Sequence, residues 1–189
     1  EMYLPYIQGK SKEPMPLYAK PDKKISVRDI QWAMRDHYEG TALDITNDIG
    51  ATAYKMPYRL SPLTFEVNGQ KYFNERPIST QQSAFSFVSQ LRSWMPREIG
   101  GVIWFGNDDA NMIAYTPVYC GNTVQPECYN TPGADAVTFS DKNAFWVCNW
   151  VSNMVYPRYS QIFPELKTVR DSLEASYFAQ QADFEKKAM

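Results

Sequence analysis

The chain has 189 residues and a formal net charge of -2, with a sequence pI near 5.5. This balance gives no electrostatic attraction to a nucleic-acid backbone or an acidic membrane surface, and no apolar run approaches the ~20 residues of a membrane-spanning helix. The composition therefore argues against nucleic-acid-binding and membrane-spanning proteins. With 44% hydrophobic residues, a chain of this length forms one globular domain or part of a larger one.

Residues 1–24 are rich in proline and lysine and predict an extended leading segment, whereas residues 25–189 carry the patterns of a folded domain. Ser26 followed by Asp29 predicts a capping box, and apolar residues then recur at helical spacing until Gly40, a natural C-terminal stop. A helix is therefore expected to start after Ser26, with a long loop following it over residues 41–62.

Asn68-Gly69 lies between two alternating apolar runs and predicts a tight hairpin over residues 64–73. Residues 83–91 alternate as a strand should. Because few of them are charged, we expect this strand to be covered on both faces.

Two more strands are expected over residues 100–105 and 112–119, which makes an antiparallel meander. Asn107-Asp108-Asp109-Ala110-Asn111 joins them as a polar turn. This turn lacks the ligand spacing of a twelve-residue calcium loop, which favours a solvated hairpin turn.

Two helices are expected in the last third of the chain, the first capped by Ser140 and ended or kinked by Pro157. The apolar face of the first helix comprises Val147, Trp150, Val151 and Met154, and that of the second comprises Ile162, Leu166, Val169, Leu173, Tyr177 and Phe184. Strands followed by helices, without βαβ alternation, predict an α+β fold with an antiparallel sheet and covering helices.

Ionisable side chains are concentrated in one short stretch, where Arg35, Asp36, His37 and Glu39 fall within five consecutive residues. Such a stretch favours either an ion-paired helix end or a substrate-facing site, because close charges and a histidine tune each other's protonation. Gln81-Gln82 presents the same pair of alternatives: contact with a ligand, or satisfaction of backbone groups at the rim of the sheet.

The three cysteines give no metal or nucleophile signature. Cys120 and Cys128 bracket a short loop and are either bridged or free thiols, and Cys148 is expected to pack within a helix. The chain has a single histidine and no Cys-x-x-Cys pair, so we expect no metal site and no cofactor.

Several stretches, taken together and in this order, resemble the C-terminal portion of the cysteine dipeptidases of the dipeptidase A type. They are residues 35–41 with Asp44 and Arg59, 79–82 leading into 87–92, 101–106, 115–119 and 149–159. The resemblance implies an N-terminal-nucleophile hydrolase that cleaves dipeptides, with an αββα sandwich of two antiparallel sheets between helical layers. It further implies a nucleophilic cysteine at the mature N-terminus, whose own α-amino group serves as the base.

This chain begins with Glu1, and none of its cysteines lies near the start. We therefore expect residues 25–189 to be the C-terminal part of the dipeptidase domain, inactive without the N-terminal half. No catalytic residue is expected within the chain.

The resemblance implies substrate-binding roles for a set of polar residues: Arg35, Asp36, His37, Glu39, Arg59, Gln81 and Gln82. Asp36 or Glu39 would bind the ammonium group of a dipeptide, and Arg35 or Arg59 its carboxylate. Two alternatives stay open, a non-catalytic peptide- or glycan-binding module on the same fold and a related amide acylase. Self-association through apolar surface is expected of a fragment, and the sequence leaves the compartment open.

Overall fold

The computed structural model describes residues 2–59, 64–73, 76–132 and 134–189. Its helices are α1 (Leu4–Ile7), α2 (Val27–Met34), α3 (Arg97–Gly100), α4 (Ala144–Val155) and α5 (Tyr159–Ala188), with 3-10 turns η1 (Ile45–Asn47), η2 (Ile49–Ala51), η3 (Glu127–Tyr129) and η4 (Tyr156–Arg158). Its strands are β1 (Thr64–Val67), β2 (Gln70–Phe73), β3 (Phe85–Leu91), β4 (Gly101–Asn107) and β5 (Thr116–Tyr119). The described strands form two small antiparallel sheets, β1-β2 and β3-β4-β5, so the α+β class is confirmed.

Helix α2 begins at the predicted capping box. The Ser26 hydroxyl accepts from the Asp29 amide at 3.2 Å, and the Asp29 carboxylate accepts from the Ser26 amide at 2.8 Å. These bonds satisfy two of the helix-end donors that have no partner within the helix. The leading segment is not wholly extended as expected, because Pro5 in the first turn of Leu4–Ile7 allows the short helix α1.

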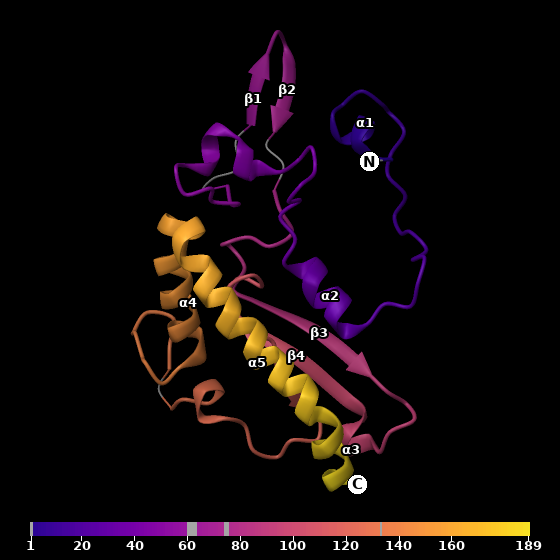
Figure 1. Cartoon of the computed structure of the whole chain (residues 1–189), viewed down its shortest axis with the longest axis vertical. Helices are drawn as coiled ribbons and strands as arrows, with labels where there is room; N and C mark the ends of the chain where they lie inside the picture. Colours follow the sequence, from indigo (N-terminus) through magenta and orange to yellow (C-terminus); the bar gives the residue numbers. More distant parts are fainter. Residues whose placement is uncertain (1, 60–63, 74–75, 133) are drawn as a thin grey trace.

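The β1-β2 hairpin turns at the predicted dipeptide. Asn68 and Gly69 have φ of 53° and 75°, which matches the left-handed pair that a two-residue turn requires. The strands pair in register from Val67 opposite Gln70. The hairpin projects away from the three-stranded sheet (Figure 1), so it contributes nothing to the core around that sheet.

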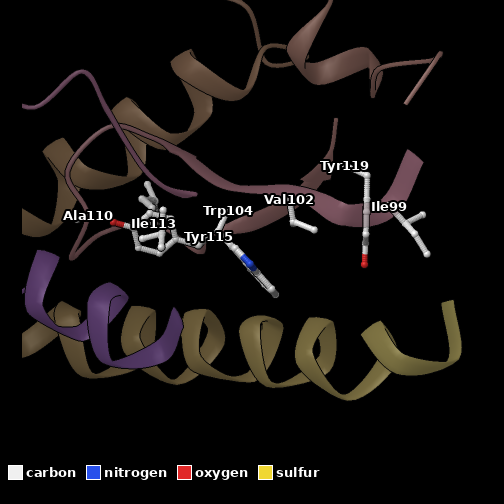
Figure 2. Packing of buried hydrophobic residues seen from close by; sticks show 8 residues of the cluster. Ile99, Val102, Trp104, Ala110, Ile113, Tyr115 and Tyr119 are labelled. Carbon is white, nitrogen blue, oxygen red and sulfur yellow. The ribbon is translucent and has the colours of Figure 1, made fainter. Parts of the chain in front are cut away.

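The main core lies between the three-stranded sheet and α5. Val88 pairs with Trp104, and Trp104 with Pro117, across the antiparallel ladder. Helix α5 runs diagonally across one face of the sheet (Figure 1), and Trp104 points from the sheet toward it (Figure 2). The Trp104 ring stacks on Phe178 with centroids 4.2 Å apart and is fully buried. This stack fixes α5 against the central strand.

The opposite face of this sheet is open, so the expectation that β3 is covered on both faces is wrong for this chain. Phe85, Phe87 and Leu91 are 56%, 49% and 79% exposed. Phe105 on β4 stacks with Phe85 at 6.0 Å between centroids and meets Tyr129 edge-on at 5.7 Å. A row of aromatic and aliphatic side chains on a sheet face is an apolar surface of the kind that marks an interface.

The two C-terminal helices bury the predicted apolar stripes only in part: Val151, Ile162, Leu166 and Tyr177 pack against the core. Trp150 and Met154 on α4 are 56% and 58% exposed, and Val169 on α5 is 58% exposed. The inward positions of α5 include Arg170 and Glu174, because buried backbone and side-chain groups beneath the helix demand charged partners. Helix α4 is capped by Asn143 rather than Ser140. No helix in the described ranges is long and apolar enough to cross a bilayer.

The C-terminal end of α5 is held by a polar clamp. Glu185 pairs with Arg92 at 2.7 Å and accepts from the Tyr119 hydroxyl at 2.8 Å. Burial raises the pKa of Glu185, but the hydrogen bonds from Tyr119 and Arg92 outweigh it, so the net pKa is below its ordinary value. Burial and the same carboxylate raise the pKa of Tyr119 to about 12.

We expect Trp104→Ala to lower the free energy of unfolding by about 3–5 kcal/mol, because it leaves a large cavity beneath α5. Urea unfolding followed by circular dichroism measures this loss. The matched control is Trp94→Ala, at a residue that is 77% exposed. The control should change stability by less than about 0.5 kcal/mol. Equal effects of the two substitutions would contradict the stated core.

A second prediction concerns the pH dependence of the clamp. A lowered native pKa means that ionised Glu185 stabilises the fold above its ordinary pKa of 4.5 and loses that contribution as the pH falls below it. The stability difference between the wild type and Glu185→Gln should therefore be full at neutral pH and should shrink in acid. Glu165→Gln, on the exposed surface of the same helix, is the control and should be nearly neutral. A stability difference between the wild type and Glu185→Gln that does not shrink in acid would show that ionised Glu185 is not the stabilising group.

Candidate functional site

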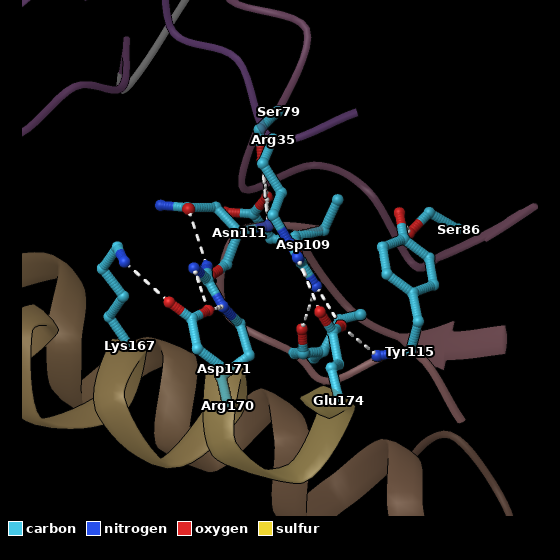
Figure 3. A network of polar contacts seen from close by, with 12 residues as sticks. Arg35, Ser79, Ser86, Asp109, Asn111, Tyr115, Lys167, Arg170, Asp171 and Glu174 are labelled. Atoms are coloured by element: carbon cyan, nitrogen blue, oxygen red, sulfur yellow. Dashed lines mark hydrogen bonds and ion pairs between the residues drawn. The ribbon is translucent and has the colours of Figure 1, made fainter. Parts of the chain in front are cut away.

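Arg35 follows the last turn of α2 and bonds two distant parts of the chain. Its Nε donates to the Ala110 carbonyl at 2.8 Å, Nη2 donates to the Ile113 carbonyl at 3.0 Å, and Nη1 donates to Glu174 at 3.0 Å. Glu174 in turn accepts from the Tyr115 amide at 2.7 Å (Figure 3). The guanidinium group is thus engaged in joining α2 and α5 to the segment between β4 and β5.

His37 is completely buried. Its Nδ1 lies 3.2 Å from Glu39 Oε1, and the ring meets Tyr58 edge-on at 4.8 Å. Nε2 has no hydrogen-bond partner among the described residues. Burial raises the pKa of Glu39, but the hydrogen bonds of His37 outweigh it and the net pKa lies below the ordinary value. The histidine and this carboxylate therefore form a local pair that closes the turn after α2.

Asp36 also has a structural function in the same turn. Its backbone carbonyl accepts from the amides of Ile78 and Ser79, both at 3.2 Å, and its Oδ1 accepts from the Tyr38 amide at 3.1 Å. These bonds place the segment that carries Gln81 beside the end of α2. The carboxylate lies at a groove of about 730 Å³ between α2 and α5, together with Arg35 and Glu39.

The remaining predicted residues are Arg59, Gln81 and Gln82. Arg59 pairs with Asp48 at 2.5 Å, and its backbone carbonyl accepts from Gln81 Nε2 at 2.5 Å. Gln82 Oε1 accepts from Arg76 at 3.0 Å. Gln81 and Gln82 both line a cavity of about 310 Å³. Five of the seven predicted site residues therefore lie at two separate hollows, and His37 and Arg59 line neither.

The smaller cavity has a polar lining without any cationic side chain. Gln81 and Gln82 come from the segment before β3, Asp108 from the end of β4, and Asn149 and Asn153 from α4. The full lining is Met56, Tyr58, Gln81, Gln82, Asp108, Asn149, Asn153, Tyr156 and Pro157. Four amide side chains and one carboxyl are suited to binding the peptide group and a positive charge.

A buried polar cluster beneath this cavity was not expected from the sequence. Asp109 is fully buried and accepts from the Ser79 hydroxyl and from the Tyr156 hydroxyl, the latter at 3.3 Å. Asn111 donates to the Tyr159 hydroxyl at 3.0 Å and accepts from Arg170 at 3.0 Å (Figure 3). The prediction of a solvated turn at 107–109 is therefore wrong. These polar residues can be buried because distant segments of the chain supply their hydrogen-bond partners.

The phenols around this cluster are held neutral. Burial, followed by the nearby Asp109 carboxylate, raises the pKa of Tyr58 and Tyr156 far above the ordinary value of 10. Burial likewise raises the pKa of Tyr159. Neutral phenols act as hydrogen-bond donors at physiological pH, so these tyrosines orient their neighbours.

The cysteines lack the setting of a nucleophile. Burial raises the pKa of Cys148 to about 11, which keeps it as an unreactive thiol at neutral pH. Cys120 is an exposed free thiol and Cys128 a partly buried one. In the part of the chain that the structure describes, no three His, Cys, Asp or Glu side chains come together in a way that suits a metal ion.

We expect Arg35→Met to lower the free energy of unfolding by about 3–5 kcal/mol, because it leaves Glu174 buried without its cation. Chemical unfolding measures the loss. Lys167→Met is the control, since Lys167 and Asp171 form an exposed pair at one helical turn. It should cost about 0.5 kcal/mol or less. A small loss at Arg35 would show that its ion pair does not hold the fold.

Curated proteins similar to this chain share the word dipeptidase in their names. Dipeptidase A of Lactobacillus helveticus is 25% identical over 165 residues, which cover 87% of this chain and 30% of the relative. Probable dipeptidase B of Streptococcus pyogenes serotype M1 is 24% identical and covers 87% of this chain and 31% of its own length. A probable dipeptidase of Salmonella dublin is 30% identical over 109 residues, which cover 58% of this chain and 21% of the relative. The chain thus spans a third or less of the length of these relatives.

A match to a protein family covers a larger part of the sequence. Peptidase family C69 matches residues 1–172. This range includes the smaller cavity, the buried cluster and every residue predicted to bind substrate, whereas the groove between α2 and α5 extends beyond it to Glu174, Ala175 and Phe178. Because the match extends over most of the chain, the chain belongs to peptidase family C69.

Proposed function

We propose that this chain is the C-terminal part of a dipeptidase, and that it supplies one wall of the substrate site. The observation that carries the proposal is the family match over residues 1–172, joined by relatives named dipeptidase that are about three times as long as the matched segment. The nucleophile is a cysteine upstream of this chain, at the N-terminus of the mature protein. Its α-amino group serves as the base, since a free pKa of about 8 leaves part of that amine neutral.

The open face of the three-stranded sheet supports this arrangement. Phe85, Phe87 and Leu91 form an apolar surface that is about half exposed or more in this chain. We assign this face to contact with a second sheet in the missing N-terminal half, which completes the αββα sandwich of an N-terminal-nucleophile hydrolase. Two sheets packed face to face bury such side chains between them. In the isolated chain, the same face is available to a second copy.

Within the wall, the predicted residues have two kinds of role. Gln81 and Gln82 face substrate in the smaller cavity. The other five residues hold in place the segments that line this cavity, through the ion pairs and backbone hydrogen bonds described above. They are Arg35, Asp36, His37, Glu39 and Arg59. Substitutions at these five residues should alter stability together with activity, whereas Gln81→Ala should raise the dipeptide KM with little loss of stability.

The test is amino-acid release from a panel of dipeptides, measured for the complete protein and for these 189 residues alone. We expect release only by the complete protein, and none after the upstream cysteine is replaced by alanine. Cys120→Ala in the complete protein is the control and should retain activity, since Cys120 is exposed and outside both hollows. Release by the isolated chain, or by the variant without the upstream cysteine, would overturn the proposal.

A further inference from the structure

The smaller cavity contains a carboxyl group whose hydrogen bonding is incomplete. Asp108 is 3% exposed although it follows directly after β4 at the surface of the sheet. Its Oδ1 accepts from the Asp109 amide at 2.7 Å. Its Oδ2 has no hydrogen-bond partner within the described part of the chain. A buried carboxylate oxygen without a partner costs free energy until a donor or a cation meets it.

The charges around Asp108 do not supply that cation. Burial raises the pKa of Asp108 and has the largest effect. The Asp109 amide lowers it by hydrogen bonding, the Asp109 carboxyl raises it by charge, and the polar side chains of Ser152 and Asn149 on α4 lower it, so the net pKa is above its ordinary value. The other titratable groups that face it are the Cys148 thiol and the Tyr156 phenol, and both are neutral. No Lys, Arg or His is among the residues that line the cavity. The site therefore has one acidic group and no built-in counter-ion.

The rest of the lining suits a small peptide. The volume of about 310 Å³ is at the lower end of the range for small-molecule sites. Gln81, Gln82, Asn149 and Asn153 offer amide donors and acceptors to a peptide bond, and Met56 and Pro157 offer apolar contact for a side chain. Both the size and the chemistry of the cavity match one or two amino-acid residues.

We propose that Asp108 Oδ2 binds the α-ammonium group of the peptide substrate. The inference rests on the proposed function, and it replaces Asp36 and Glu39 as the expected ammonium-binding residues. Those two carboxylates already accept backbone amides or His37 in the turn after α2. Recognition of a free N-terminus in this way restricts the site to peptides with an unblocked amine.

The backbone holds this carboxylate in place before a ligand arrives. Asp108 has a φ of 80°, a conformation that Asp and Asn tolerate better than other non-glycine residues. The bond from Asp109 to Oδ1 fixes the side-chain angle, and Asp109 is itself held by Ser79 and Tyr156. The free oxygen is thus preorganised, which limits the entropy lost on binding.

The test compares Asp108→Asn with the wild type in the complete protein. Asparagine keeps the shape and tolerates the positive φ while it removes the charge. The probes are an alkene isostere of Ala-Ala, which cannot be hydrolysed, and its N-acetylated form, with Kd measured by calorimetry. Asp108→Asn should weaken binding of the free-amine probe about tenfold or more and leave that of the acetylated probe nearly unchanged. Asp183→Asn, on the exposed side of α5, is the control and should change neither Kd.

Equal weakening of both probes, or no change in either, would overturn the inference. If Asp108→Asn fails to fold, the wild type alone still decides the question, because ammonium recognition requires it to bind the free-amine probe about tenfold tighter than the acetylated one. Equal affinities would overturn the inference. A wild type that binds selectively but releases no amino acids would refute the dipeptidase proposal and leave the ammonium site standing. A wild type that releases amino acids but binds both probes equally would refute the ammonium site and leave the dipeptidase proposal standing.

Discussion

The buried loop between β4 and β5 is the constraint on which the rest of this structure depends. Asp109 and Asn111 are almost completely removed from water and must find partners within the protein. They find them in Ser79, in the tyrosines of η4 and α5, and in Arg170. Each of these buried groups would cost about 1–3 kcal/mol without its partner. The loop therefore dictates where α5 and the segment before β3 lie.

The same loop sets the chemistry of the candidate site. Asp108 precedes the buried cluster and lines a cavity whose other walls come from α4 and the glutamine pair. The packing that stabilises the sheet thus also leaves one carboxyl desolvated and unpaired. A catalytic group is not needed in this part of the proposed enzyme. A rigid wall that recognises one end of a dipeptide is sufficient, and the nucleophile is assigned to the other half.

Local signals in the sequence predicted local structure well. The Ser26–Asp29 box, the Asn68-Gly69 turn and the long C-terminal helix all depend on residues close in sequence, and all appear in the structure. The density of charge at residues 35–39 marked a segment of importance but not its partners, because Glu174 lies 139 positions away from Arg35. Two adjacent aspartates look the same in a solvated turn and in a buried cluster. Only distant residues such as Arg170 and Tyr156 distinguish the two cases.

The proposed role of this chain is to form the ammonium-binding wall of a dipeptide site. A crystal structure of the complete protein with the Ala-Ala alkene isostere tests it most directly. The account predicts the ligand nitrogen at about 3 Å from Asp108 Oδ2, with the upstream cysteine across the cavity from Gln81 and Gln82. A ligand bound elsewhere, with Asp108 facing only water, would contradict it.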